Sequence, residues 1–363
     1  MARVVIIGAG ASIDASDSRL PGATNFFRCI RNHAELSYEL KSKDMRDTLT
    51  SLLPLSLDSP ASLKALDKVN VEDIFTLASL KAEMDLDDKH LSRLTELIRK
   101  TIVTCSKGVK KGGHYSPFVE HMLDNRTSFI SFNWDILLDE ALPDYRAPGD
   151  EYGPNPASDL HSEYRRICTA DASQESFFGD RPPPQQDSFV AKPAYLKLHG
   201  SIDAVVCKNQ HCKNYLLPFR VPYCGSSLYC QDCYEKVAPF LVPPVQNKPI
   251  RQFHHIRRTW MLASKLIQQA EEVIVRGYSL PPTDHWSRWL LGHIWGQEAR
   301  CRKLVIINPE AAFLSPKKKI KVPNMGFVER FHPWRNLSTP QIKVEAYEFY
   351  DLYVKREAIG QVD

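Results

Sequence analysis

Five of the nine cysteines in this chain lie close together, between residues 207 and 233. Cys207 and Cys212 form a CxxxxC pair, and Cys230 and Cys233 form a CxxC pair. Two thiolate pairs separated by a spacer of this length are typical of a tetrahedral structural zinc site with no open coordination position. We therefore expect a small zinc-binding lobe at about residues 203–240, which zinc would fold without taking part in catalysis.

Two alternatives to a plain four-cysteine site stay open. Cys224 or His211 could replace one ligand, because the gap in the first pair is wider than the usual two residues. A redox or disulfide role is the other alternative. The remaining cysteines lie far apart, which argues against a disulfide framework and for a reduced, cytoplasmic environment. They are Cys29, Cys105, Cys168 and Cys301.

Small or polar residues follow five apolar segments that are typical of buried β-strands. The expected strands cover residues 2–7, 127–132, 194–198, 272–276 and 304–307, and they alternate with helical segments, which predicts a parallel sheet. The residues that follow them are Gly8, Ala9, Gly10 and Ser12, then Asn133 and Asp135, His199 and Gly200, Gly277 and Ser279, and Asn308. Ligands of open parallel sheets bind outside the carboxyl ends of the strands. We therefore expect these residues to converge on one cleft.

The pattern Gly8-x-Gly10 after a strand is the most familiar of these motifs. It lets the backbone approach a pyrophosphate while the following helix N-terminus offers free N–H groups. However, Ile13 stands where the third glycine of the dinucleotide fingerprint would be, and no strand carries a ribose-binding acid about 20 residues on. The motif is thus not an ordinary dehydrogenase site, and a strand-ending turn with no special role is the alternative.

The rest of the chain predicts the elements that position these residues. Residues 23–123 read as a helical insert, and 136–141, 252–270 and 284–296 read as further helices. Residues 148–186 read as a long surface loop. The predicted fold class is α/β, a Rossmann-like parallel sheet with a helical insert and a small zinc lobe. We assign residues 1–330 to one catalytic domain and leave 331–363 as a C-terminal extension of unknown role.

Composition excludes several classes of protein. The 363 residues carry a net charge of +4, with 25% charged and 43% hydrophobic residues, which fits a globular protein and not a disordered one. No apolar run approaches the roughly 18 residues of a membrane-spanning helix, and residues 4–11 are too short and glycine-broken for a secretory signal. Basic clusters at 107–111, 251–258 and 317–321 lack interleaved aromatic residues, so we expect solvated faces and no direct nucleic-acid binding.

Taken in order, these motifs resemble those of the sirtuin superfamily. The matching segments are Gly8-Ala9-Gly10-Ala11-Ser12, Phe132-Asn133-Trp134-Asp135, Leu198-His199-Gly200-Ser201, the cysteine module, Gly277-Tyr278-Ser279-Leu280 and Ile307-Asn308. In detail the set is closer to the sirtuin-like branch of bacterial anti-phage defence proteins, which hydrolyse NAD, than to protein deacylases. Deacylases carry a GIPDFR-like stretch where this chain has residues 20–28, and an FGE segment where it has Phe240-Leu241-Val242-Pro243-Pro244.

The resemblance implies roles for individual residues. Asn133 would orient the nicotinamide ribose or the attacking water, and His199 would take a proton from a ribose hydroxyl or from that water. Asp135 would help to shape the nicotinamide pocket, while Gly8, Ala9, Gly10 and Gly277 would line the dinucleotide. Ser12 would reach a phosphate, Ser279 would lie near the adenosine, and Asn308 would bond its ribose.

The expected activity is that of an NAD glycohydrolase, which cleaves NAD to ADP-ribose and nicotinamide. Nicotinamide leaves as a neutral ring, so the site needs no general acid but must stabilise an oxocarbenium-like ribose. The resemblance also implies an anti-phage effector that works as a homo-oligomer or with a partner defence protein. An NAD-dependent lysine deacylase is one alternative, and a non-catalytic NAD or ADP-ribose sensor is the second.

Overall fold

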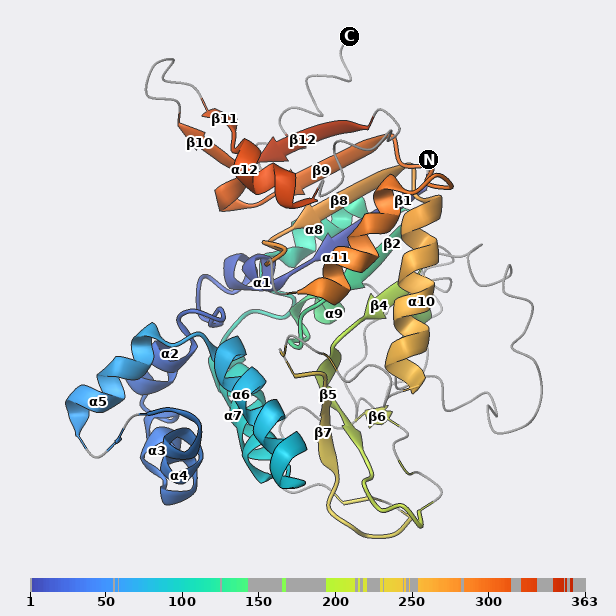
Figure 1. Ribbon diagram of the computed structural model, residues 1–363. Coiled ribbons are helices and arrows are strands. Elements are labelled where there is room, and N and C mark those ends of the chain that lie inside the picture. Colours follow the sequence, from blue (N-terminus) through green and yellow to red (C-terminus); the bar gives the residue numbers. More distant parts are fainter. Residues whose placement is uncertain are drawn as a thin grey trace.

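The computed structural model describes most of the chain, including the strands of a central sheet (Figure 1). The described residues are 2–54, 56–57, 59–124, 126–142, 165–167, 194–212, 215, 218–220, 229–230, 232–243, 245, 248, 254–281, 284–314, 321–331, 342–348, 350 and 353–354. Cys224, most of the expected loop at 148–186, residues 251–253 of one basic cluster and residues 317–320 of another lie outside them. None of the described helices is long and apolar enough to cross a membrane.

Among the described residues, seven parallel strands form the central sheet, in the order β12-β9-β8-β1-β2-β4-β3. Their bounds are β1 (Arg3–Ile7), β2 (Thr127–Ser131), β3 (Arg165–Ile167), β4 (Ala194–Lys197), β8 (Glu272–Arg276), β9 (Lys303–Ile307) and β12 (Lys343–Tyr347). After β1 the chain adds β2, β3 and β4 on one side of that strand within the sheet. It then adds β8, β9 and β12 on the other side. The topological switch point therefore lies at the carboxyl ends of β1 and β8, where ligand sites of such sheets are found.

Helices cover both faces of the sheet because its strands are apolar on both sides. Val5 and Ile7 pack on the face covered by α1 (Ala9–Ala15), α8 (Tyr115–Met122) and α9 (Leu137–Ala141). Val4 and Ile6 pack on the opposite face, against α10 (His254–Gln269), α11 (His285–Gly292) and α12 (Met325–Val328). Figure 1 shows α10 and α11 in front of the sheet and α8 behind it. The expected α/β fold with a Rossmann-like parallel sheet is confirmed.

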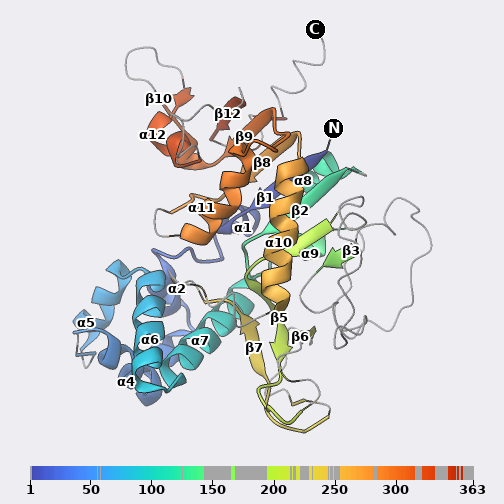
Figure 2. The same cartoon turned by 45° about the vertical axis from the view of Figure 1, so that its right-hand side comes forward.

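The expected helical insert is also present, as a group of helices beyond the carboxyl ends of the strands (Figure 2). It consists of α2 (Phe26–Asn32), α3 (Ser37–Lys41), α4 (Lys43–Leu52), α5 (Pro60–Ala65), the short helix Leu66–Lys68, α6 (Val71–Asp85) and α7 (Lys89–Ser106). Side-chain caps define several of its helix starts: Ser42 accepts from Met45 N, and Ser59 forms a capping box with Ser62. The last helix of the 23–123 stretch, α8, belongs instead to the cover of the sheet.

The small lobe forms an antiparallel sheet in the order β6-β5-β7. Its strands are β5 (Gly200–Val206), β6 (Pro218–Arg220) and β7 (Ala238–Leu241). β5 begins directly after His199, at Gly200, whose φ is +78° and where a Cβ atom would lie 2.1 Å from the Phe240 carbonyl oxygen. Only glycine fits there. The helical insert packs against the small lobe, because α7 contacts β5 and β7.

The carboxyl-terminal region contributes two features that the sequence pattern did not predict. β12 pairs in parallel with β9 and brings Tyr347 into the core, so residues 343–347 belong to the central sheet. Between β9 and β12, β10 (Ala312–Leu314) and β11 (Lys321–Pro323) form a separate antiparallel hairpin.

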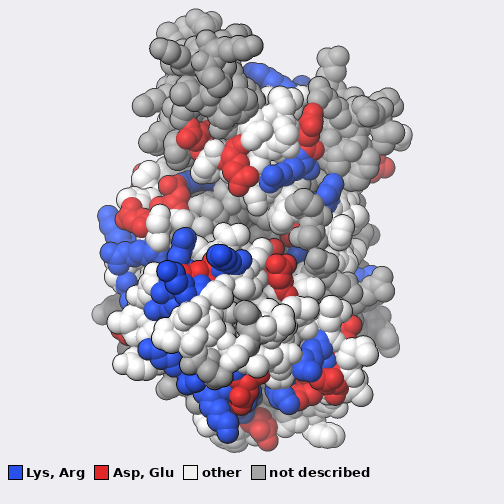
Figure 3. Space-filling model, turned by 60° about the vertical axis from the view of Figure 1, so that its left-hand side comes forward, with Lys and Arg blue, Asp and Glu red and all other residues white. Residues whose placement is uncertain are grey.

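Charged side chains of the insert are largely paired. Arg31 pairs with Asp67, and Lys107, from one of the basic clusters, pairs with Glu35. On the face shown in Figure 3, basic and acidic groups lie interspersed among uncharged residues. This fits the expected solvated faces, although surface pairs of this kind contribute little to stability.

Candidate active site

Hydrogen bonds connect the residues that follow β1, β2 and β4. Asn133 Nδ2 donates to the Gly8 carbonyl oxygen at 3.0 Å and to Ser12 Oγ at 2.7 Å. His199 Nδ1 lies 3.1 Å from the carbonyl oxygen of Phe132, the residue before Asn133. Three segments far apart in the sequence thus come together as expected from the strand order. We call Gly8, Ser12, Asn133, Asp135 and His199 the strand-end site.

The imidazole of His199 is held in a single tautomer. A carbonyl oxygen can only accept, so Nδ1 carries the hydrogen and Nε2 keeps its lone pair. Nε2 is buried and has no hydrogen-bond partner among the described residues. Burial lowers the pKa of His199 to about 3; the Lys248 ammonium also lowers it, whereas Asp284 and the bond to Phe132 oppose this. The side chain is therefore neutral at pH 7, and Nε2 presents its lone pair as a hydrogen-bond acceptor.

Aromatic rings enclose this histidine. Its ring centroid lies 5.2 Å from that of Phe132 and 6.0 Å from that of Trp260. Tyr278 stacks on Phe132 at 4.5 Å, and Trp260 Nε1 donates to the Leu198 carbonyl oxygen at 3.0 Å. These contacts fix the ring of His199 in an apolar wall, which is the physical reason for its lowered pKa.

A buried ion pair lies beyond the aromatic wall. Lys248 Nζ donates to Asp284 at 2.7 Å, and Tyr278 donates to the same carboxylate at 2.8 Å. Burial raises the pKa of Asp284, but the nearby Lys248, His199 and the hydrogen bonds outweigh it and bring the pKa to about 2. Asp284 also caps α11 through Ser287 N. This carboxylate therefore fixes the Tyr278 ring that supports the wall.

Asp135 and Ser12 form a second polar group on the other side of Asn133. Ser12 is 3% exposed, and its hydroxyl lies 3.1 Å from that of Tyr115 and bonds to the Asp135 carboxyl. Asp135 also accepts from Leu137 N at 3.0 Å. Burial raises the pKa of Asp135, while Lys197, Ser12 and Leu137 N lower it. The Ser12 hydroxyl is thus occupied within the protein, and its phosphate contact stays a prediction.

The glycines after β1 lie against the turn after β8. Gly8 N donates to the Arg276 carbonyl oxygen and Gly10 N to that of Gly277. A Cβ at Gly10 would lie 2.9 Å from the Gly277 oxygen, and one at Gly277, where φ is +65°, would lie 2.0 Å from Ala11 N. Close packing of two backbone segments therefore accounts for these glycines. Their contact with a pyrophosphate, and that of the exposed Ala9, stays a prediction.

The two residues predicted for the adenosine side lie beside this junction. Gly277 N donates to the carbonyl oxygen of Ile307, which places the turns after β8 and β9 next to each other. Asn308 Oδ1 accepts from Glu310 N at 2.9 Å, as in an ordinary Asx turn, and Ser279 is half-buried. The structure brings both residues to the same edge of the sheet as the strand-end site, and their roles stay predictions.

The four predicted zinc ligands form one cluster, which we call the cysteine cluster. The sulfurs of Cys207, Cys212, Cys230 and Cys233 all lie within 4.8 Å of one another. The Cys207–Cys233 and Cys212–Cys230 sulfur distances are 3.6 and 3.7 Å, far too long for disulfides. A tetrahedron with Zn–S bonds of about 2.3 Å needs sulfurs about 3.8 Å apart, so this set fits a zinc ion. The exposed His211 is not part of it.

The loops that carry the sulfurs repeat one local geometry. The N–H of Asn209 bonds to the sulfur of Cys207, and the N–H of Asp232 bonds to that of Cys230, in each case two residues on. Such bonds stabilise thiolates, which is the form that binds zinc. The cluster could therefore hold a structural ion that ties β5 to the loop before β7.

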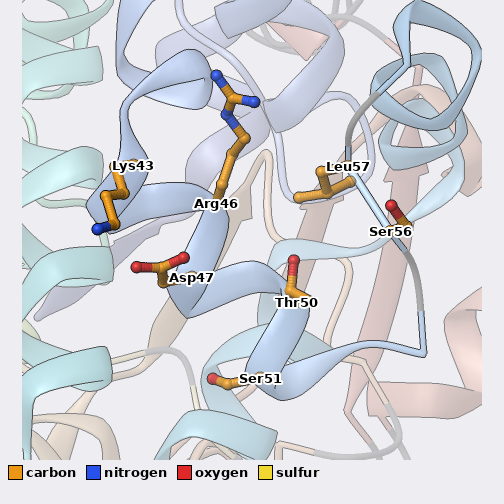
Figure 4. A pocket seen from close by; sticks show the side chains of 7 residues that line it. All are labelled: Lys43, Arg46, Asp47, Thr50, Ser51, Ser56 and Leu57. Atoms are coloured by element: carbon orange, nitrogen blue, oxygen red, sulfur yellow. The ribbon is translucent and has the colours of Figure 1, made fainter.

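A hollow of about 630 Å³ lies elsewhere, in the helical insert (Figure 4). It is lined by Lys43, Arg46, Asp47, Thr50, Ser51, Ser56 and Leu57. The guanidinium of Arg46 is already bonded to the Lys41 carbonyl oxygen. The hollow contains none of the predicted site residues.

Several residues that contact the strand-end site or act on it were not predicted. Tyr115, on α8, contacts Ser12, while Lys248 and Asp284 act electrostatically on His199, and only the tertiary fold brings them there. Lys197 did leave a signal, because a lysine inside the apolar run Ala194–Leu198 is unusual for a buried strand.

No family model matches the chain, and no curated protein matches it. Among solved structures, it is similar to a mutant Sir2 homologue in complex with 2'-O-acetyl ADP-ribose, with 15% identity, 92% of each chain covered and a TM-score of 0.39. A Sir2 homolog–NAD complex is 14% identical, with 92% of this chain and 89% of that chain covered and a TM-score of 0.35. A third structure, described as bearing on the mechanism and regulation of Sir2 enzymes, is 15% identical with a TM-score of 0.37. These structural neighbours are Sir2 homologues, at a low level of similarity.

Proposed function

We propose that this protein is an NAD glycohydrolase, which cleaves NAD with water to ADP-ribose and nicotinamide. The observation that carries the proposal is a pair of hydrogen bonds at the carboxyl ends of three parallel strands: Asn133 bonds to Gly8, and His199 bonds to Phe132, the residue before Asn133. These bonds hold the Asn133 and His199 segments together, at the edge of the sheet where the sirtuin-like motifs of the sequence also end.

The side chains suggest how the reaction would run. Both amide hydrogens of Asn133 are used by Gly8 and Ser12, so its Oδ1 is the atom left to accept a hydrogen bond from a water or a ribose hydroxyl. His199 Nε2 would take the proton of that group. The glycosidic C–N bond breaks with its electron pair passing to the nicotinamide ring, and the water oxygen forms the new bond to the ribose carbon.

The cysteine cluster would hold zinc as a structural ion. All four positions of a tetrahedral zinc would be filled by cysteine sulfur, which leaves no position for water or substrate. Zinc would therefore stabilise the lobe that begins at Gly200, next to His199, and take no part in the cleavage.

The biological setting belongs to the same proposal. From the motif resemblance we infer a cytoplasmic anti-phage effector that depletes NAD, acting as a homo-oligomer or together with a partner defence protein. Residues 1–330, together with the strand at 343–347, would form the catalytic unit.

The deciding experiment is a nicotinamide-release assay with and without an acyl-lysine peptide, on the wild type and on His199→Ala. The proposal expects release from NAD alone, unchanged by the peptide and lost in His199→Ala. Release that strictly needs the peptide would indicate a deacylase. Thermal stabilisation by NAD or ADP-ribose with no product, under every condition tried, would indicate a sensor.

A further inference from the structure

Lys197 is a fully buried ammonium group in the middle of the fold. Its side chain is 0% exposed and follows Leu196 on β4, where it pairs in register with Ser131 of β2. Burying a charge is unfavourable unless it is paired and hydrogen-bonded. A lysine in such a strand therefore indicates a role that an apolar residue could not fill.

The partners of this ammonium lie on the segment that carries Asn133. Lys197 Nζ donates to the backbone carbonyl oxygen of Asp135 and, at 3.1 Å, to Oδ2 of Asp139 on α9. The same Asp139 oxygen accepts from the Tyr195 hydroxyl at 2.8 Å. One side chain of β4 thus holds both the turn that follows β2 and the helix that follows the turn.

We call the contacts of Lys197 with Asp135 and Asp139 the clamp. Its location beside the proposed catalytic residues suggests a role beyond that of a buried ion pair. Lys197 stands two residues before His199, and Asp135 stands two residues after Asn133. The two segments are also joined by backbone bonds, from Leu198 N to Ser131 and from Ile202 N to Trp134, and by the bond between the His199 ring and the Phe132 carbonyl oxygen. Lys197 adds a charged hydrogen bond inside that frame, to a carbonyl group two residues after the proposed catalytic amide.

We propose that Lys197 is a positioning residue: through Asp135 and Asp139 it holds the Asn133 turn in register with His199, so that both face the same substrate carbon. This inference rests on the proposed cleavage of NAD. It predicts that loss of the clamp reduces turnover more than substrate binding, because the groups that bind the substrate stay in place while the two reacting groups drift apart.

The test uses the double variant Lys197→Met, Asp139→Leu, which removes both charges together. Replacing a buried pair by apolar residues of similar volume usually preserves stability. We expect a folded protein with normal zinc content, a kcat for nicotinamide release at least tenfold lower, and a KM for NAD within about threefold of wild type. Hydrogen exchange of the amides at 133–137 should become faster.

The matched control is Arg3→Met, Glu272→Gln, which removes an ion pair of 2.8 Å at the opposite end of the sheet. It should lower stability and leave kcat and the exchange of 133–137 unchanged. A double variant of Lys197 and Asp139 that keeps both kcat and slow exchange would overturn the proposal. So would a loss of kcat that the control reproduces.

Two further measurements cover the remaining outcomes. If the double variant does not fold, Tyr195→Phe removes only the hydroxyl bonded to Asp139; a severalfold lower kcat with faster exchange at 133–137 supports the clamp, and no change in either contradicts it. If the wild type does not cleave NAD, the proposed function fails, and the exchange comparison between the double variant and its control still decides whether Lys197 orders the turn.

Discussion

The cysteine cluster and the strand-end site gather their functional groups in opposite ways. The four sulfurs come from two short loops within one small lobe, and a zinc ion would hold them together. The strand-end site draws Gly8, Asn133 and His199 from three strands, and backbone carbonyl groups hold them in place. We therefore expect the lobe to depend on its metal and the site to depend on how closely the strand ends pack.

Loss of the metal should have the largest effect. Cys230→Ser removes one of four thiolates, and because structural zinc contributes on the order of 10 kcal/mol to such folds, the lobe should lose its order. We expect zinc content to fall well below one ion per chain and hydrogen exchange to rise across residues 200–241. Cys301→Ser, at a buried cysteine outside the cluster, is the control and should keep its zinc. A Cys230→Ser protein with full zinc content would refute the four-cysteine site.

Gly277→Ala should be the most damaging small change at the strand ends. The new Cβ would lie 2.0 Å from Ala11 N at a φ of +65°, so the turn must move away from Gly8 and Gly10. We expect a loss of roughly 2–4 kcal/mol of unfolding free energy, measured by denaturant titration. Gly296→Ala is the matched control, since its nearest neighbour atom would lie 3.8 Å away. Equal stability of the two variants would contradict the close packing described here.

The buried histidine should make stability depend on pH. The pKa of His199 is about 3 in the folded protein and about 6.5 when unfolded, so between these values the unfolded chain binds more protons. His199 therefore favours unfolding as pH falls from about 6.5 toward 3. Relative to His199→Ala, the wild type should lose stability across this window and show a constant difference above it. A difference that does not change with pH would mean that the imidazole is not buried in its neutral form.

Trp260→Phe should have the smallest effect of these changes. It removes the hydrogen bond from Nε1 to the Leu198 carbonyl oxygen, worth about 0.5–1.5 kcal/mol. Trp295→Phe removes an equivalent bond to the Phe331 carbonyl oxygen, away from the strand ends. Both variants should lose similar stability, but only Trp260→Phe should lower nicotinamide release, by a few fold. Equal turnover in both would place Trp260 outside the site.

The two regions also differ in how far the sequence could predict them. Cysteine spacing is a local property, and all four predicted ligands cluster. The meeting of Asn133 with His199 was predicted from a topological rule, since the ends of parallel strands share one edge. That rule predicts where the strand ends lie, but it does not predict which side chains of other elements pack beside them. Tyr115, Lys248 and Asp284 reach the site through tertiary packing, which leaves no periodic signal.

The carboxyl-terminal strand was missed for a related reason. β12 is an edge strand whose pattern Lys343-Val344-Glu345-Ala346-Tyr347 mixes charged and apolar residues, and it joins the sheet only by pairing with β9. A buried strand such as β1 can be predicted from its continuous apolar run, whereas a partly solvated edge strand has no such run.

In the proposed reaction, Asn133 and His199 act together on a single substrate carbon. A double-mutant cycle of Asn133→Ala and His199→Ala, with kcat for nicotinamide release as the readout and zinc content as the check on folding, tests it most directly. His199→Ala should lower kcat by about 10²–10⁴-fold, as expected for loss of a general base. Adding Asn133→Ala should then cost little more, because residues that act as one unit are not additive. Losses that simply multiply, or near-normal turnover in His199→Ala, would contradict it.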